Sequence, residues 1–281
     1  MALQCGIVGL PNVGKSTLFN CLSNAQAQSA NFPFCTIEPN VGTITVPDQR
    51  LFKLESLVNP EKVIPTTIEI VDIAGLVKGA SKGEGLGNQF LGNIRSTNAI
   101  IHVVRCFDDP NVIHVDGSVD PVRDKEIIDT ELQLKDLDTV EKAQSKHSKA
   151  AKTGDKAIVK LVELMNRTIA HLSEGKSVRS MKLEEEEQRQ IDELQLLTSK
   201  PILYVCNVDE NSVVSGNAHT TAFEASVNDE NAEILYISAA IESEIATMER
   251  DDQMMFLEEM GLKESGVARL IQSAYHLLKY I

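Results

Sequence analysis

The chain has 281 residues, of which 42% are hydrophobic and 24% are charged, and its formal net charge is −14. This length allows one large domain or a domain with an appendage, and the apolar fraction supports a buried core. The strong negative charge argues against a protein that coats nucleic acid, so we expect no DNA partner.

The sequence shows no sign of export or membrane insertion. No apolar run approaches the roughly 18 residues that span a bilayer, and the N-terminus lacks the cationic start of a signal peptide. The five cysteines are scattered without metal-ligand or disulfide spacing, as in a reducing compartment. We predict a cytoplasmic protein without a membrane partner.

A phosphate-binding motif, Gly9–Ser16, links the first predicted strand, Gln4–Gly9, to a predicted helix, Gly14–Ser23. Glycines let backbone N–H groups turn toward an anion, and the helix start adds its positive dipole end. Lys15 places a charge on the terminal phosphates, which makes it a catalytic candidate, and the Ser16 hydroxyl can bind Mg²⁺. An ordinary glycine turn would not explain this lysine and hydroxyl. The predicted nucleotide-binding residues here are Asn12, Val13, Gly14, Lys15, Ser16 and Thr17.

Two later segments supply further candidates for the triphosphate and its metal. The predicted strand Thr67–Ile73 contains Asp72 near its end, where a carboxylate can hold Mg²⁺ through a water. The N–H of the following Gly75 can bond the γ-phosphate. Thr36, in the loop between the phosphate-binding motif and this strand, can complete the Mg²⁺ shell, although a loop hydroxyl alone is a weak signal. We therefore predict Ser16, Thr36 and Asp72 as metal ligands.

A glycine-rich segment follows Asp72. Six glycines lie between residues 75 and 92, which suits a segment that becomes ordered only around a γ-phosphate. Switch GTPases usually place a glutamine directly after the aspartate–glycine motif to orient the attacking water, but this chain has Leu76 there. Another group must therefore orient the water, or hydrolysis is slow without a partner.

An inserted helical arm is predicted over residues 123–199, between the predicted strands Ala99–Cys106 and Ile202–Asn207. Leucines and isoleucines recur there at helical spacing, which is typical of an antiparallel coiled coil. Residues 141–182 contain ten Lys or Arg and four Asp or Glu, a local net charge of +6. This charge favours contact with an anion such as RNA phosphate, although a solvated helical face explains the lysines equally well.

The base-binding segment is expected at Asn207–Glu210, after a strand. Guanine-specific switches carry asparagine, lysine, any residue and aspartate there, and the aspartate accepts two hydrogen bonds from guanine. Glu210 is one methylene too long for that geometry, and Val208 lacks the lysine stem. The lost contact costs guanine about 1–3 kcal/mol, whereas the amino group of adenine can donate to Asn207 or to a backbone carbonyl. We expect ATP to bind at least as well as GTP; a degraded guanine site that still takes GTP is the alternative.

The last predicted strand, Glu233–Ser238, is followed by a sequence similar to the serine–alanine–lysine loop of GTPases, with Ala240 in place of lysine. Ser238 and Ala239 are therefore also predicted to bind the nucleotide.

The alternation of strands and helices predicts an α/β fold with a mostly parallel sheet flanked by helices. Several strands are almost continuous in Val, Ile and Leu, as in strands buried on both faces. We assign residues 1–122 and 200–281 to a P-loop nucleotide-binding domain of the G type. The remaining predicted elements are the strand Val41–Val46 and the helices Gly87–Ser96 and Ser265–Tyr280.

These motifs together resemble the YchF-type branch of the Obg-like P-loop proteins, in the translation-factor class of GTPase folds. The likeness rests on Gly9–Ser16, Asp72–Gly75, Leu76 and Asn207–Glu210, and it covers nearly the whole chain. The resemblance implies an ATPase that associates with ribosomes and has a nucleotide domain, an inserted coiled coil and a C-terminal TGS domain. The chain stops at Ile281, where the TGS domain would begin, so we expect that domain to be absent. The expected partner is a ribosome or ribosomal RNA, which the family would bind through the arm or through the missing domain.

The resemblance implies two further roles. His114, in the loop after the strand that ends at Cys106, would replace the missing glutamine, since a neutral imidazole can orient a water; a lone loop histidine is otherwise a surface residue. Asn12 would help to bind K⁺ beside the phosphates, and a simple turn asparagine is the alternative.

We predict a Mg²⁺-dependent, ATP-hydrolysing P-loop protein of the Obg-like type, acting as a ribosome-associated regulatory switch with slow intrinsic turnover. The alternative is a GTP-binding switch, or a nucleotide-dependent binding module with negligible hydrolysis. A metabolite kinase is disfavoured because no acceptor-site motif or lid is present. A motor-type or AAA+ ATPase is disfavoured because Ile73, and not a glutamate, follows Asp72.

Overall fold

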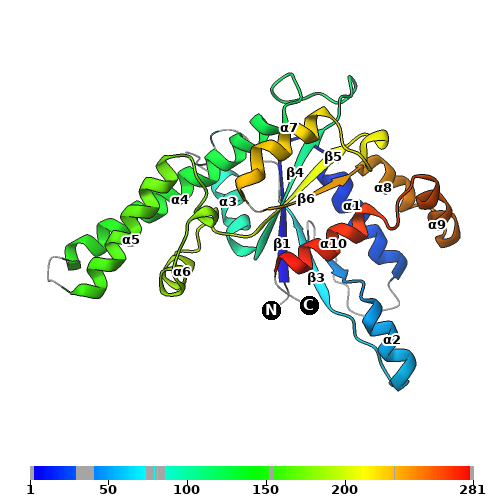
Figure 1. The fold of residues 1–281 in the computed structure, drawn as a ribbon, viewed down its shortest axis with the longest axis horizontal. Coiled ribbons are helices and arrows are strands. Elements are labelled where there is room, and N and C mark those ends of the chain that lie inside the picture. Colours follow the sequence, from blue (N-terminus) through cyan, green and yellow to red (C-terminus); the bar gives the residue numbers. More distant parts are fainter. Residues whose placement is uncertain are drawn as a thin grey trace.

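A computed structural model of the chain describes residues 3–29, 41–73, 79, 81, 86–151, 155–230 and 232–278. Within these residues a six-stranded sheet has the order β2-β3-β1-β4-β5-β6 (Figure 1). Strand β2 is antiparallel to β3, and all other pairs are parallel. The strands are β1 (Leu3–Val8), β2 (Val41–Thr45), β3 (Thr67–Asp72), β4 (Ala99–Cys106), β5 (Ile202–Val208) and β6 (Glu233–Ile237).

Two inner strands, β4 and β5, are buried on both faces, as their apolar sequences predicted. Every residue of β4 and β5 is buried, because helices cover both faces of the sheet. Helices α1, α8 and α10 contact one another on one side, and α4 and α7 contact each other on the other side (Figure 1). The α-helices are α1 (Lys15–Ser29), α2 (Gln49–Val58), α3 (Leu86–Ser96), α4 (Pro121–Ala151), α5 (Lys156–Ser173), α6 (Glu185–Asp192), α7 (Ala218–Val227), α8 (Ala239–Ile245), α9 (Arg250–Glu259) and α10 (Gly266–Leu277), and the 3₁₀-helices are η2 (Val178–Ser180), η3 (Glu210–Ser212) and η4 (Asn228–Glu230).

The predicted α/β class is confirmed, and each predicted strand lies within one or two residues of an observed one. The predicted first helix is too short, since α1 continues to Ser29. The last turns of α1 were not predicted because the apolar pattern of the sequence fades after residue 23.

The arm consists of α4 and α5, followed by α6 (Figure 1). The two long helices are antiparallel, because Gln144 of α4 bonds Asn166 of α5 at 3.2 Å, while Gln133, nearer the start of α4, bonds the Gly175 carbonyl just after α5 at 2.9 Å. The arm has a small apolar core of its own, separate from that of the sheet; its buried members are Val140, Leu164, Met165, Leu172, Val178, Ile191 and Leu196.

The first turns of α4 belong to the nucleotide domain. Ile128 and Leu132 are part of the core around the sheet, whereas Val140, two to three turns later, belongs to the core of the arm. The same helix therefore leaves the sheet and becomes the arm without a break. The division at residues 122 and 123 stays a prediction.

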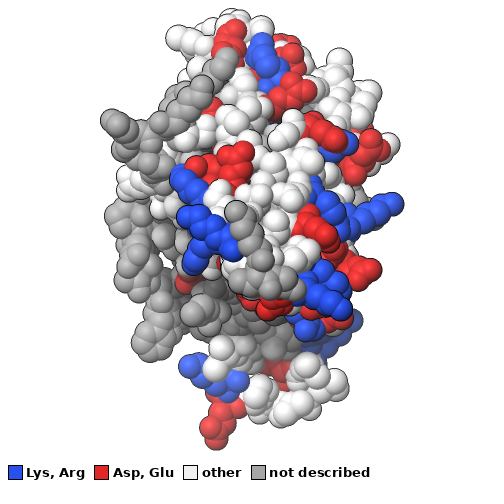
Figure 2. Space-filling model, turned by 90° about the vertical axis from the view of Figure 1, so that its left-hand side faces the viewer, with Lys and Arg blue, Asp and Glu red and all other residues white. Residues whose placement is uncertain are grey.

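The surface of the arm mixes both signs of charge. Figure 2, which looks onto the end of the molecule that carries the arm, shows Lys and Arg interspersed with Asp and Glu. Lys142 pairs with Asp138 at 2.7 Å, and Arg167 pairs with Glu187 at 2.7 Å. Some of the basic residues counted in the sequence are thus neutralised by acids on the arm itself.

Candidate functional site

The phosphate-binding motif forms the turn between β1 and α1, as predicted. Gly14 has φ = +97°, and a side chain there would place its Cβ 2.3 Å from the amide nitrogen of Asn207. Only glycine fits both the left-handed backbone and this close contact. The Gly14 carbonyl accepts the Leu18 N–H at 3.0 Å, so the first helical hydrogen bond begins inside the motif. The following N–H groups stand at a helix start, where an anion is favoured.

Lys15, Ser16 and Asp72 come together although 56 or more residues separate the first two from the third. Lys15 is 7% exposed, and its Nζ donates to the Leu10 carbonyl at 2.6 Å. Ser16 donates its hydroxyl hydrogen bond to the Asp72 carboxylate, which also feels the charge of Lys15. Burial raises the pKa of Asp72, while Lys15 and Ser16 act to lower it. The end of β3 thus presents a carboxylate to the start of α1.

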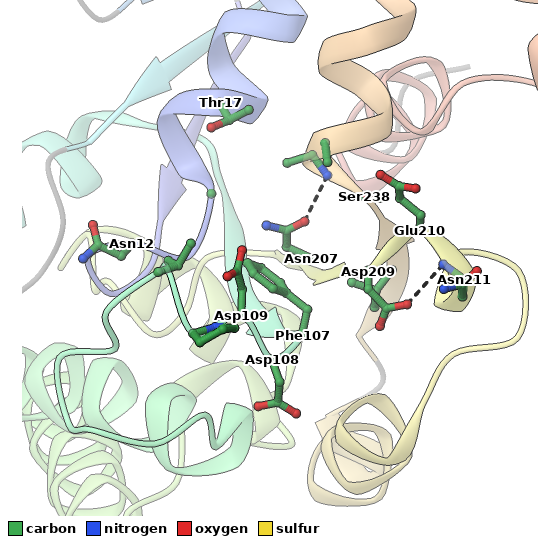
Figure 3. A pocket seen from close by; sticks show the side chains of 16 residues that line it. Asn12, Thr17, Phe107, Asp108, Asp109, Asn207, Asp209, Glu210, Asn211 and Ser238 are labelled. Carbon is green, nitrogen blue, oxygen red and sulfur yellow. Dashed lines mark hydrogen bonds between the residues drawn. The ribbon is translucent and has the colours of Figure 1, made fainter.

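A cleft of about 630 Å³ opens at the carboxyl ends of β4, β5 and β6 (Figure 3). This edge is where open parallel sheets bind ligands, and the volume suits a nucleotide. Figure 3 shows Asn12 and Glu210 on opposite sides of the cleft, with Asn207 between them. The lining residues that the sequence also predicted are Asn12, Gly14, Thr17, Asn207, Val208, Glu210, Ser238 and Ala239.

The side chain of Asn207 connects two walls of this cleft by hydrogen bonds. Its amide nitrogen donates to the Val13 carbonyl at 2.9 Å, and its carbonyl oxygen accepts the Ala239 N–H at 3.0 Å. The two polar atoms of the amide thus bridge the phosphate-binding motif and the loop after β6. The sequence predicted contact with the base, and the structure adds a bridging role.

The remaining base-motif residues differ in exposure. Val208 is buried, whereas Glu210 is exposed and begins the short helix η3. Asp209 caps that helix by accepting the Asn211 N–H, as the dashed line in Figure 3 shows. The cap holds Glu210 at the rim of the cleft, where its carboxylate is free to meet a ligand in solvent-accessible space.

One wall of the cleft, the loop after β4, was not predicted from the sequence; its lining residues are Phe107, Asp108, Asp109, Pro110 and Val112. Arg105, 2% exposed, builds this wall: its guanidinium donates to the carbonyls of Phe107, Asp109 and Val112 at 3.0, 3.2 and 2.9 Å. The same guanidinium lies over the Phe107 ring, 4.6 Å from its centroid. The sequence feature that could have indicated this wall is an arginine near the end of an apolar strand. A buried charge needs polar partners, and the following loop can provide them.

His114 lies in the predicted loop, but it is buried. Its Nε2 is 2.8 Å from Asp124 of α4, and its Nδ1 accepts the Asp116 N–H at 3.1 Å. Both ring nitrogens therefore have partners within the protein. The neighbouring Ile113 carbonyl accepts the Asn12 amide at 3.1 Å, which joins this loop to the phosphate-binding motif. Orientation of a water by His114 stays a prediction.

Three predicted positions, Thr36, Gly75 and Leu76, lie outside the described residues. In the part of the chain that is described, no three His, Cys, Asp or Glu side chains gather to hold a metal ion. No helix in that part is long and apolar enough to cross a membrane.

The chain is similar to known proteins over nearly its whole length. The family model of the 50S ribosome-binding GTPase matches residues 4–144. The ribosome-binding ATPase YchF of Bacillus subtilis (strain 168) is 54% identical over 280 residues, which cover 99% of this chain and 76% of that protein. The protein of the same name from Escherichia coli O157:H7 is 48% identical over 278 residues, with coverage of 99% and 76%. Among solved structures, the Schizosaccharomyces pombe YchF GTPase is similar with a TM-score of 0.86 and 34% identity, covering 98% of this chain and 75% of that one.

Proposed function

Because this chain belongs to the YchF family of P-loop proteins, we propose that it binds and hydrolyses ATP and acts in contact with the ribosome. The observation that supports this most directly is the convergence of Lys15, Ser16 and Asp72 beside a nucleotide-sized cleft. The ribosome is proposed as the partner because the bacterial relatives are named ribosome-binding ATPases. A protein that acts on ribosomes is expected in the cytoplasm.

The proposed reaction is in-line attack of water on the γ-phosphate, and the protein contributes position and charge. The backbone of Asn12 to Thr17 holds the phosphates, and Lys15 neutralises charge that develops on them. Gly75 would sense the γ-phosphate. Slow turnover without a partner follows from Leu76, which cannot orient water.

Mg²⁺ fits the residues present. Ser16 and Asp72 offer only oxygen ligands and already meet through a hydrogen bond, and Mg²⁺ is usually held by one or two carboxylates together with substrate phosphates. The ion would be held by Ser16, Thr36 and Asp72, directly or through water. When bound it neutralises phosphate charge.

The base would lie between the segments carrying Asn207, Val208 and Glu210 and those carrying Ser238 and Ala239. Adenine is favoured over guanine because Glu210 replaces the shorter aspartate. A GTP-binding switch is the second candidate, since the S. pombe relative is named a GTPase while the bacterial relatives are named ATPases.

Phosphate release tests the proposal, with ATP and with GTP, in the presence and absence of ribosomes. We expect slow ATP turnover by the protein alone and a different rate when ribosomes are present. If nucleotide binds but neither nucleotide is hydrolysed under either condition, the protein is a binding module and the enzymatic part is wrong.

Replacing His114 by alanine is expected to slow ATP turnover while nucleotide affinity stays unchanged, if the imidazole exchanges its bond to Asp124 or to the Asp116 N–H for one to the attacking water. Single-turnover kinetics and ADP titration measure the two quantities. His147, on α4 in the arm, provides a matched control as His147→Ala. Unaltered hydrolysis in the His114 variant would remove the residue from the mechanism.

ATP turnover is expected to be faster in K⁺ than in Na⁺ buffer if Asn12 helps to bind a monovalent cation. Asn12 has φ = +62° and faces the cleft, and its amide nitrogen is bound to Ile113, so its carbonyl oxygen is the group to meet the ion. Such an ion adds positive charge near the phosphates. Equal rates in the two buffers would leave Asn12 as a turn residue.

ATP binding near pH ~8.5 is expected to take up a proton. Burial lowers the pKa of Lys15 from its usual 10.5 to about 8, with Asp72 opposing the shift, so part of the free protein carries a neutral lysine at that pH. Phosphates beside the amine favour its charged form, and uptake should vanish near pH ~6.5, where Lys15 is already protonated. Calorimetry in buffers of different ionisation enthalpy measures the protons; equal uptake at both pH values, or uptake that persists in Lys15→Met, contradicts this assignment.

A further inference from the structure

Helix α4, which becomes the arm, carries several buried carboxylates, and two of them bind residues that follow strands of the sheet. Asp124 and Glu131 are 2% and 5% exposed. They are seven residues apart, about two helical turns, so they lie on the same face of the helix. Glu131 contacts two residues that follow Asp72 in the chain, and Asp124 contacts the loop after β4.

Glu131 binds the chain that follows β3. One of its carboxylate oxygens accepts the Gly79 N–H at 2.6 Å, and the other accepts the Ser81 N–H at 2.7 Å. Gly79 has φ = +93°, a conformation that favours glycine. Hydrogen bonds from N–H groups to a carboxylate are short and strong, and two of them fix an orientation. The carboxylate therefore holds two amides that lie seven and nine residues beyond Asp72.

Asp124 binds the loop after β4. One oxygen is 2.8 Å from Nε2 of His114, and the next residue back, Ile113, accepts the amide of Asn12 in the phosphate-binding motif. The helix is thus connected through one loop to the phosphate-binding motif and through Glu131 to Gly79 and Ser81. The rest of the same helix forms the arm, beyond Leu132.

We propose that Glu131 is a positioning residue for ATP hydrolysis: it holds the amides of Gly79 and Ser81 against α4 and so couples turnover to the placement of the arm. The inference rests on the proposed function. In-line attack depends on placement, and a shift of about 1 Å costs up to ~10²-fold in rate. A ligand that tilts the arm would move this carboxylate and change turnover without touching the nucleotide.

The test is Glu131→Gln, which keeps the shape but replaces one acceptor oxygen by an NH₂ group that meets an N–H donor. We expect kcat for ATP to fall about 10- to 100-fold, while KM and the affinity for ADP stay within about twofold of the wild-type values. Glu126→Gln, an exposed position on the same helix, should leave all three unchanged. Wild-type kcat in Glu131→Gln overturns the proposal, and so does an equal loss of kcat and ADP affinity, which would indicate general damage to the site.

Hydrogen exchange separates this inference from the proposed function. The Gly79 and Ser81 amides should exchange slowly in the wild-type protein and faster in Glu131→Gln, whether or not ATP is hydrolysed. If the wild-type protein hydrolyses no ATP, the proposed function fails while this contact can still be measured. If the glutamine variant does not fold, Glu131→Asp replaces it in the test, because its side chain is too short to reach both amides. We expect kcat to fall in this variant too, by less than in Glu131→Gln. Normal turnover in Glu131→Asp overturns the proposal.

Discussion

Replacing Lys15 by methionine is expected to lower kcat/KM for ATP by about 10²–10³-fold, the usual loss when one charged donor to a transition state is removed. Lys15 is the buried cation at the start of α1, held at the Leu10 carbonyl and next to Asp72. Methionine preserves the length and packing of the side chain but cannot balance phosphate charge. Phosphate release under single-turnover conditions measures the effect.

The control for this substitution is Lys53→Met, on the exposed face of α2, which should keep wild-type turnover. The stability of the Lys15 variant also has a definite expectation. Burial disfavours the charge of Lys15, so its removal should leave the thermal unfolding temperature unchanged or raise it. Near-normal turnover in a folded Lys15→Met protein would mean that this loop does not act on the phosphates.

Shortening Glu210 to aspartate is expected to raise the affinity for GTP relative to ATP by about tenfold or more, which corresponds to the 1–3 kcal/mol or so of a bidentate polar contact. Glu210 stands at the rim of the cleft, at the first position of η3. Aspartate would draw the carboxylate back by one methylene, to the length that suits the two N–H donors of guanine. Competition titrations with ATP and GTP give the ratio directly.

The matched control is Glu244→Asp, an exposed change on α8, which should not alter the ratio of the two affinities. An unchanged ratio in Glu210→Asp would mean that the length of this acid does not select the base. The backbone around Val208 and Ala239 would then have to account for any preference.

The sequence predicted best the features that depend on short stretches of chain. The strands β4 and β5 are largely apolar runs, so their burial on both faces could be predicted from their residues. The phosphate-binding motif is also local, because its glycine, lysine and hydroxyl act within eight residues. The meeting of Ser16 with Asp72 needed one further rule, that parallel strands end at the same edge of the sheet.

The features that were missed depend on side chains that meet across long distances in the sequence. Arg105 shapes the wall of the cleft through three carbonyls of the following loop, and no periodicity marks such a contact. His114 was placed in the correct loop, but its burial follows from Asp124 on a helix that had been assigned to the arm. Glu131 lies on the same helix and was also not predicted, since a glutamate in a charged helix is normally solvated.

Calorimetric titration of the purified protein with ATP and with GTP, side by side in the presence of Mg²⁺, decides whether the site selects adenine. We expect both nucleotides to bind through the phosphate loop formed around Gly14 and Lys15, and ATP to bind at least as tightly as GTP. No measurable affinity for ATP, or a much higher affinity for GTP, would contradict it.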